Sequence, residues 1–295
     1  ACDTPVYRYA MYNWAPAPYT IFHFVRDGEA EPDRSVEQAV RSLMAETTAA
    51  PNLEFRRLLV DDALASGELP PLLADRLEQL SPANASAYAV VAPHGHLLWF
   101  GGIDAERVGE VLDSPARREL MGQLDHGSAG VLVLVEGPDA AANDVAEMNV
   151  KEAIQLAADG QIAPIAIPGA ADGEPQPIDV GYVRVSREDP AERWFVEMLL
   201  SVEGDLAGLE QPMVFAVYGR GRAMEPWVGA GILAERLAED IAYMSGACSC
   251  EVKEQSRGID LLTAWDWDAT AVAMAERIGE ETRNEQLLSS GELLA

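Results

Sequence analysis

The segment Gly102-Ile-Asp-Ala-Glu-Arg-Val108 recurs later in the chain as Gly231-Ile-Leu-Ala-Glu-Arg-Leu237. The residues before the two copies also correspond, because Ala89-Val-Val-Ala-Pro-His-Gly-His96 precedes the first and Val214-Phe-Ala-Val-Tyr-Gly-Arg-Gly221 precedes the second. In both places apolar runs around a glycine-containing turn predict a β-hairpin, and the repeated segment opens the helix that follows. The agreement in sequence and in context indicates an internal duplication.

The elements around each copy are predicted to follow one order, strand–helix–strand–helix–hairpin–helix, from apolar periodicity and turn residues. For the first half the predicted ranges are a strand at 21–25, a helix from Ser35, a strand at 53–60, a helix at 72–80, a hairpin at 88–100, and a helix at 105–124 interrupted at Ser114-Pro115. For the second half they are a strand at 130–135, a helix at 140–158, a strand at 179–186, a helix at 191–202, a hairpin at 212–228 and a helix at 233–244.

A length of 295 residues favours two domains. We expect an aromatic, proline-rich arm over residues 1–18, a first unit over 19–128, a second unit over 129–268 and a helical tail over 269–295. The alternation of Tyr7 with Tyr9 predicts an extended arm. The alternation of Trp265 with Trp267 predicts a strand added to the second sheet.

This element order resembles that of the thioredoxin fold, and the chain up to about residue 245 resembles two such units in tandem. The resemblance rests on the element order and on the internal repeat. It implies an α/β protein with two tandem thioredoxin-like units, each β-α-β-α-β-β-α, around mixed central sheets. Right-handed strand–helix–strand crossovers are expected in both units.

Thioredoxin-like redox enzymes carry Cys-x-x-Cys just after the first strand, where the N-terminus of a helix lowers the pKa of the attacking thiol. The matching positions are Arg26-Asp27-Gly28-Glu29 and Glu136-Gly137-Pro138-Asp139, and neither contains cysteine. Acidic residues at such a position oppose a thiolate. We therefore predict no dithiol chemistry there, no catalytic residue and no cofactor-binding residue.

The three cysteines are Cys2, Cys248 and Cys250. A first interpretation is a structural disulfide from Cys2 to one of the pair, which would tie the arm to the second unit. A second is a strained Cys248–Cys250 disulfide able to exchange with thiols. A third is a soft-metal site for Cu(I), with Met244 one helical turn earlier as a further ligand.

The opening Ala-Cys-Asp-Thr-Pro is typical of a mature chain left by signal-peptide cleavage, which predicts a periplasmic, cell-surface or extracellular protein. Lipidation of Cys2 is the alternative, and the presence of Ala1 disfavours it. The longer stretch Ala-Cys-Asp-Thr-Pro-Val-Tyr-Arg-Tyr-Ala-Met-Tyr resembles the mature start of exported, uncharacterised proteins of planctomycete-type bacteria.

The formal net charge is −28, and lysine occurs only at Lys151 and Lys253. Such a surface repels phosphate, so the composition excludes nucleic acid as a partner and disfavours anionic membrane surfaces. No apolar run approaches the ~20 residues that span a bilayer. The acidity serves solubility, or it forms a docking face for a basic partner or divalent cations.

Two further candidates are expected to be structural. His94 and His96 flank a turn glycine, and no further metal ligand lies near them in the sequence. Arg220 and Arg222 form the clearest basic patch, and we expect them to pair with acids rather than bind an anionic ligand. No Gly-x-Ser-x-Gly elbow occurs. The sequence therefore predicts a non-catalytic interaction or assembly protein, with a protein partner or self-assembly; the alternative is a thiol–disulfide or copper-handling protein acting through Cys248 and Cys250.

Overall fold

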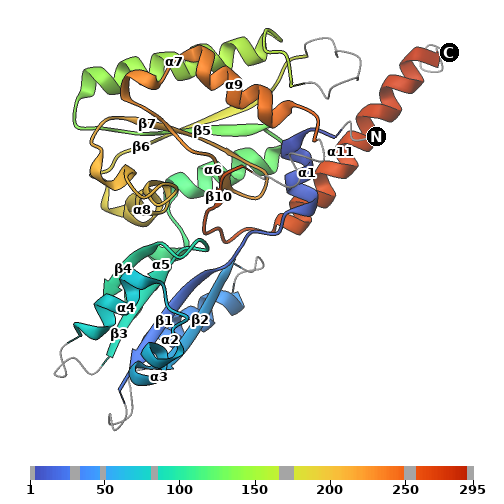
Figure 1. The fold of residues 1–295 in the computed structure, drawn as a ribbon. Coiled ribbons are helices and arrows are strands. Elements are labelled where there is room, and N and C mark those ends of the chain that lie inside the picture. Colours follow the sequence, from blue (N-terminus) through green and yellow to red (C-terminus); the bar gives the residue numbers. More distant parts are fainter. Residues whose placement is uncertain are drawn as a thin grey trace.

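The computed structural model describes residues 4–26, 34–46, 51–80, 86–165, 176–248 and 257–290. Two mixed β-sheets, each covered by helices, lie one after the other along the chain (Figure 1). Both sheets have the mixed strand pairing expected of two thioredoxin-like units, so the predicted fold class is confirmed.

The first sheet has the strand order β2-β1-β3-β4. Its central strand β1 pairs in parallel with β2 and antiparallel with β3, and β3 continues antiparallel to β4. The elements are β1 (Tyr19–Val25), α2 (Ser35–Glu46), β2 (Leu53–Leu59), α3 (Val60–Ser66), α4 (Pro71–Glu78), β3 (Ser86–Val91), β4 (Leu97–Gly101), η1 (Ala105–Arg107) and α5 (Val108–Leu112).

Alternate residues of β1 separate the two faces of this sheet. Phe22 and Phe24 stack with ring centroids 5.6 Å apart and pack toward α3 and α4. His23 faces the other way, where its ring stacks on Tyr88 at 4.3 Å. That second face is covered by α2 and α5. The first unit is therefore a sheet between two helical layers.

The second sheet repeats this pairing. Its central strand β5 is parallel to β6 and antiparallel to β7, and β7 pairs antiparallel with β8 and β9. The elements are β5 (Gly130–Val135), α7 (Ala140–Ala158), β6 (Val180–Val185), η2 (Pro190–Glu192), α8 (Arg193–Leu200), η3 (Leu206–Gly208), β7 (Met213–Tyr218), β8 (Arg222–Ala223), β9 (Trp227–Val228), η4 (Gly229–Gly231) and α9 (Ala234–Ser245).

Helices cover both faces of the second sheet as well. The helices α7 and α9 pack on one face, and α8 and α6 (Pro115–His126) pack on the other (Figure 1). The Gln123 side chain of α6 bonds the edge strand β6 twice, accepting from the Tyr182 N–H at 2.9 Å and donating to its carbonyl at 3.0 Å. The helix α6, which precedes β5 in the chain, thus packs on the second sheet. The predicted boundary between the units, between residues 128 and 129, stays a prediction.

The predicted extended arm is wrong over residues 6–13, which form the helix α1 (Val6–Asn13). Val6, Ala10 and Met11 are buried at helical spacing against the second unit, and this burial outweighs the period-two signal of the tyrosines. Before the helix, Pro5 forms a β-bridge with Ala247. No helix continues through the prolines at 16 and 18, as expected.

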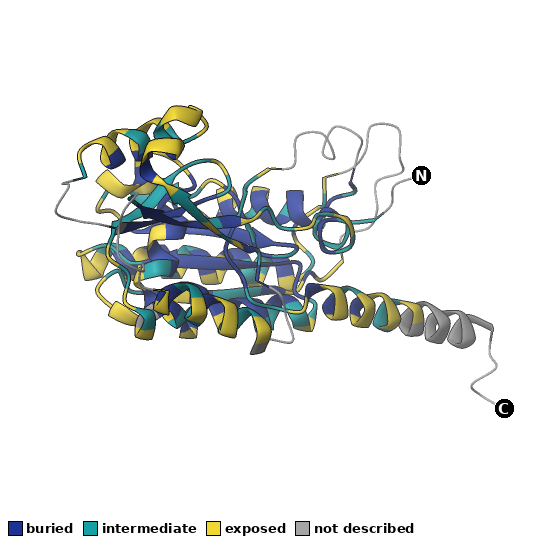
Figure 2. Cartoon of the chain, turned by 90° about the horizontal axis from the view of Figure 1, so that it is seen from below, coloured by how far each residue is buried: buried dark blue, intermediate teal, exposed yellow. Residues whose placement is uncertain are grey.

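The predicted strand at Trp265 and Trp267 is also wrong, because the strand that joins the second sheet lies earlier, at β10 (Ile259–Asp260), paired with β8. Trp267 instead opens α11 (Trp267–Ser290), which projects beyond the body of the molecule (Figure 2). Its early turns bury Met274 and pack Ile278 against the core, on the face predicted for the tail. No helix in the described parts of the chain is both long and apolar enough for a membrane span.

Candidate functional site

The loop between β5 and α7 occupies the place where a thioredoxin-like unit would carry its thiols. Asn143 locks it, accepting from the Gly137 N–H and donating to the Gly137 carbonyl, both at 2.8 Å. Asp139 caps the helix by accepting from the Ala141 N–H at 2.9 Å. The N–H groups of Gly137, Ala141 and Ala142 are therefore already bonded within the chain. In the first unit, residues 27–29 of the matching loop lie outside the described residues.

Cys248 is buried in the second unit and lies beside the start of the chain. Its N–H donates to the Thr4 carbonyl at 2.9 Å. Met244 is buried in the same apolar cluster, and its Sδ would lie 2.4 Å from a Cβ placed on Gly130. Met244 is thus tightly packed in the core. Cys2 and Cys250 lie outside the described residues, so the disulfide and copper interpretations stay predictions.

The two turn histidines lie close together, with ring centroids 5.9 Å apart. His94 Nε2 donates to the Ser201 carbonyl at 2.8 Å, which links the first unit's hairpin to the end of α8. Burial, and then the neighbouring His94, lower the pKa of His96. No group of three or more His, Cys, Asp and Glu side chains suited to a metal ion occurs among the residues that the structure describes.

The two arginines of the turn after β7, Arg220 and Arg222, hold neighbouring segments together. Arg220 donates to the Met11 carbonyl at 2.6 Å and pairs with Asp268 at 2.8 Å. Arg222 pairs with Asp260 at 2.9 Å and lies over the Trp14 ring. The expectation that these arginines pair with acids is confirmed. They hold α1, β10 and the start of α11 against the second sheet.

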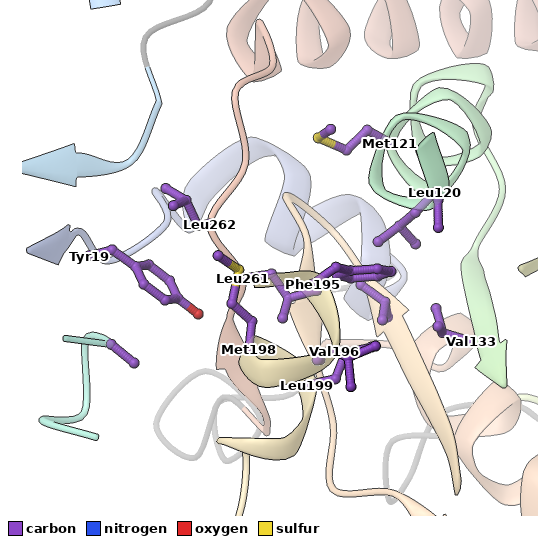
Figure 3. Packing of buried hydrophobic residues seen from close by; sticks show 14 of the residues in the cluster. Tyr19, Leu120, Met121, Val133, Phe195, Val196, Met198, Leu199, Leu261 and Leu262 are labelled. Atoms are coloured by element: carbon purple, nitrogen blue, oxygen red, sulfur yellow. The ribbon is translucent and has the colours of Figure 1, made fainter. Parts of the chain in front are cut away.

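A buried arginine holds the junction between the units. Arg117 in α6 is 1% exposed, and it donates to the carbonyls of Val111 and Glu110, both at 2.9 Å, and of Leu262 at 3.4 Å. Burial lowers its pKa to about 10. In the same region Tyr19 extends from the start of β1 into the apolar cluster that continues into the second unit (Figure 3). The two units therefore share one core at this place.

Beside this junction lies a cavity of about 970 Å³ that sequence reasoning missed. Its walls come from β4 and the segment after it, α5, the start of α6, η2 with α8, and the segment before α11. Three tryptophans line it, namely Trp99, Trp194 and Trp265. The rings of Trp99 and Trp194 meet edge to face with centroids 6.1 Å apart, and Arg193 lies 4.9 Å from the centroid of Trp99.

The polar groups around the cavity are few. Asp113 pairs with Arg118 at 2.5 Å. Asp104 accepts from the Glu106 N–H at 3.0 Å, and neither Asp104 nor Glu110 has a cationic partner among the described residues. Lining charges are Asp104, Glu110 and Asp113 against Arg118 and Arg193, a net of −1. In the sequence, the cavity is represented only by three tryptophans that lie far apart in the chain.

The comparisons with known proteins add little. No protein-family model matches the chain, and no curated protein matches it. Among solved structures the chain is similar to human ERp44 in its zinc-bound form, with a TM-score of 0.25 and 9% identity over 84% of this chain. The chain spans 63% of the length of that protein. The two-unit architecture rests on the strand pairing described above.

Proposed function

We propose that this chain is an exported, non-catalytic interaction or assembly protein built on two thioredoxin-like units without redox chemistry. The observation that carries the proposal is the loop before α7, where Asn143 and Asp139 bond the backbone groups that a reactive thiolate would need. The loop supplies no thiol, and its charged side chains are acidic: Glu136 pairs with Arg184 and Asp139 caps α7. Such a unit has the thioredoxin-like fold without its redox chemistry, and its surface is proposed to bind a partner.

The proposed export rests on the cysteines. Cys2 stands two residues before Thr4, whose carbonyl accepts from the Cys248 N–H. This pairing supports a disulfide between the start of the chain and the Cys248-Ser249-Cys250 segment. We infer a structural disulfide from Cys2 to one of them, as suits a periplasmic, cell-surface or extracellular protein.

The partner is proposed to be another protein or a second copy of this chain. The net charge of −28 favours basic partners and speeds their association at low salt. Phosphate-rich partners remain disfavoured for the same reason.

Thiol counting tests the cysteine assignment. We expect mass spectrometry of the unfolded, unreduced protein after alkylation to find one modified cysteine, since one disulfide uses two of the three, and three after reduction. A bridge from Cys2 in the peptide map supports the structural role. A Cys248–Cys250 bridge, or three modified cysteines without reduction, contradicts it.

A thiol-exchange assay tests the non-catalytic assignment. We expect the reduction of insulin disulfides by dithiothreitol to proceed at the same rate with the protein, with its Cys248→Ser variant and without either. An acceleration that Cys248→Ser removes, or bound copper that the same substitution abolishes, would establish the alternative function through Cys248 and Cys250.

A further inference from the structure

We propose that the junction cavity binds a basic, proline-rich segment of a partner protein in the polyproline II conformation. This deepens the proposed function, on which it rests, by naming the chemistry of the partner. The cavity, of about 970 Å³, is large enough to enclose several side chains of such a segment.

The walls suit proline rings. Trp99 and Trp194 meet edge to face, and Trp265 lines the cavity from the segment before α11. Aromatic-lined grooves bind polyproline II segments because the pyrrolidine rings pack on indole faces, and the preformed helix loses little entropy on binding. All three tryptophans pack against the core and stay partly exposed at the cavity, with Arg193 over the Trp99 ring.

The polar groups suit main-chain carbonyls. Trp99 donates its indole N–H to the Gly102 carbonyl at 3.3 Å, whereas the indole N–H groups of Trp194 and Trp265 have no acceptor among the described residues. A polyproline II segment has no internal hydrogen bonds and presents free carbonyl acceptors. A saccharide would also stack on tryptophan, but an uncharged sugar would not be drawn to the −28 chain as a basic peptide is.

The carboxylates beside the cavity favour basic residues at the ends of the bound segment. Asp104 and Glu110 are exposed and lack a cationic partner among the described residues, whereas Asp113 is already paired with Arg118. Arg193 is held over the Trp99 ring. Lysine or arginine at the ends of the segment would meet the two unpaired carboxylates, and the −28 chain would steer such a ligand.

Isothermal titration with a synthetic peptide, a run of prolines flanked by arginines, tests the proposal. We expect micromolar affinity that weakens with salt. Gly109 faces open space in α5 at the cavity wall, so Gly109→Leu should fill the cavity and weaken binding at least about 10-fold without straining the helix. Gly279→Leu, at an exposed and equally open position of α11, is the matched control and should bind like the wild type.

Two further variants separate the contribution of the aromatic wall to the peptide affinity from that of the carboxylate charge. Trp194→Ala should weaken the peptide about 10-fold, and Glu110→Lys about 3-fold, the latter only when the peptide carries its arginines. Absence of saturable binding, equal binding by Gly109→Leu and Gly279→Leu, or preference for a cello-oligosaccharide over the peptide would overturn the assignment. Insulin reduction measured on the same preparations reports separately on the proposed function, because thiol-exchange activity contradicts that function whatever the peptide result.

Discussion

The two sheets share one pairing pattern but differ in the segments that cover them. In both sheets the central strands are buried, since every residue of β5 and β7 and nearly all of β1 are buried, and the edge strands β2 and β6 are mixed. Strand β4, at the other edge of the first sheet, is half-buried throughout. A duplicated topology therefore does not give duplicated cores. The second unit gains additional cover from α6, from α1 and from the residues around β10, and the first unit keeps exposed surface beside the junction cavity.

A substitution at the junction between the two units is expected to cost the most stability. Arg117 joins the cover of the first sheet to the second through carbonyls of α5 and of the segment after β10. We expect Arg117→Ala to lower the free energy of unfolding by about 4 kcal/mol, because it leaves buried carbonyls without a donor. Urea denaturation followed by circular dichroism measures the change.

The neighbouring arginine provides the control for that experiment. Arg118 is exposed and forms only a surface ion pair with Asp113, so Arg118→Ala should cost less than about 1 kcal/mol. Equal losses for the two variants would mean that the junction contributes no more than the surface does.

A pair of leucines tests the difference between a central strand of the second sheet and an edge strand of the first. Leu134 in β5 is 0% exposed and Leu59 in β2 is 38% exposed. Leu134→Ala should lower the free energy of unfolding by about 3 kcal/mol, since it removes buried methyl groups and leaves a cavity, and Leu59→Ala by less than about 1 kcal/mol. Similar losses from the same denaturation measurement would contradict the larger contribution of the buried central strand.

The dense second unit also buries a carboxyl group, on α9. Asp240 is 4% exposed and accepts from Trp227 Nε1 at 2.8 Å. Burial raises its pKa to about 6, against lowering by the Trp227 hydrogen bond and by Arg257, while Glu239 and Glu225 raise it slightly further.

The sign of the effect on stability follows from that shift. The folded state holds the proton more tightly than the unfolded chain, so stability from this group is present below about pH 4 and is lost as the pH rises through about 6. Asp240→Asn keeps an acceptor for Trp227 and removes the charge. We expect the difference in free energy of unfolding between Asp240→Asn and the wild type to shift by about 2 kcal/mol in favour of the variant as the pH rises from about 4.5 to 7.5. A difference that stays constant with pH would contradict burial as the cause.

The smallest effect concerns the edge of the second sheet. Gln123 bonds the Tyr182 backbone twice, so Gln123→Ala should cost about 1 kcal/mol and speed hydrogen exchange at Tyr182. Arg118→Ala, at an exposed position of the same helix whose side chain pairs with Asp113, should leave exchange at Tyr182 nearly unchanged. Unaltered exchange in the Gln123 variant would show that α6 does not hold this edge.

Local signals predicted much of the fold. The bounds of α7 agree with the prediction because Asp139 caps the helix and small residues recur along its buried face. The break at Ser114-Pro115 was also visible, since serine is a good N-cap and proline fits the first helical turn. By contrast, the strand predicted at 53–60 ends at Leu59 and continues directly into α3, which was not predicted; Asp61 and Asp62 lie in the first turn of α3, where acids stabilise a helix N-terminus.

The remaining features depend on contacts between distant parts of the chain. α1 forms where its apolar residues dock on the second unit, which no local period could reveal. The cavity is lined by Trp99, Trp194 and Trp265, which only the packing of the units brings together. The absence of Cys-x-x-Cys after β5, by contrast, was readable from the residues alone, because it depends on one short segment.

The position of α1 sets the order in which the parts of the protein can fold. Ala10 in α1 lies against Gly219, where an added Cβ would come within 2.7 Å of the Ala10 Cβ, and Arg220 bonds the Met11 carbonyl. α1 ends at Asn13, whereas the strand that leads to its binding surface begins only at Met213. The amphipathic helix therefore has no docking surface until the second unit has formed, so its docking is a late step that joins segments far apart in the sequence.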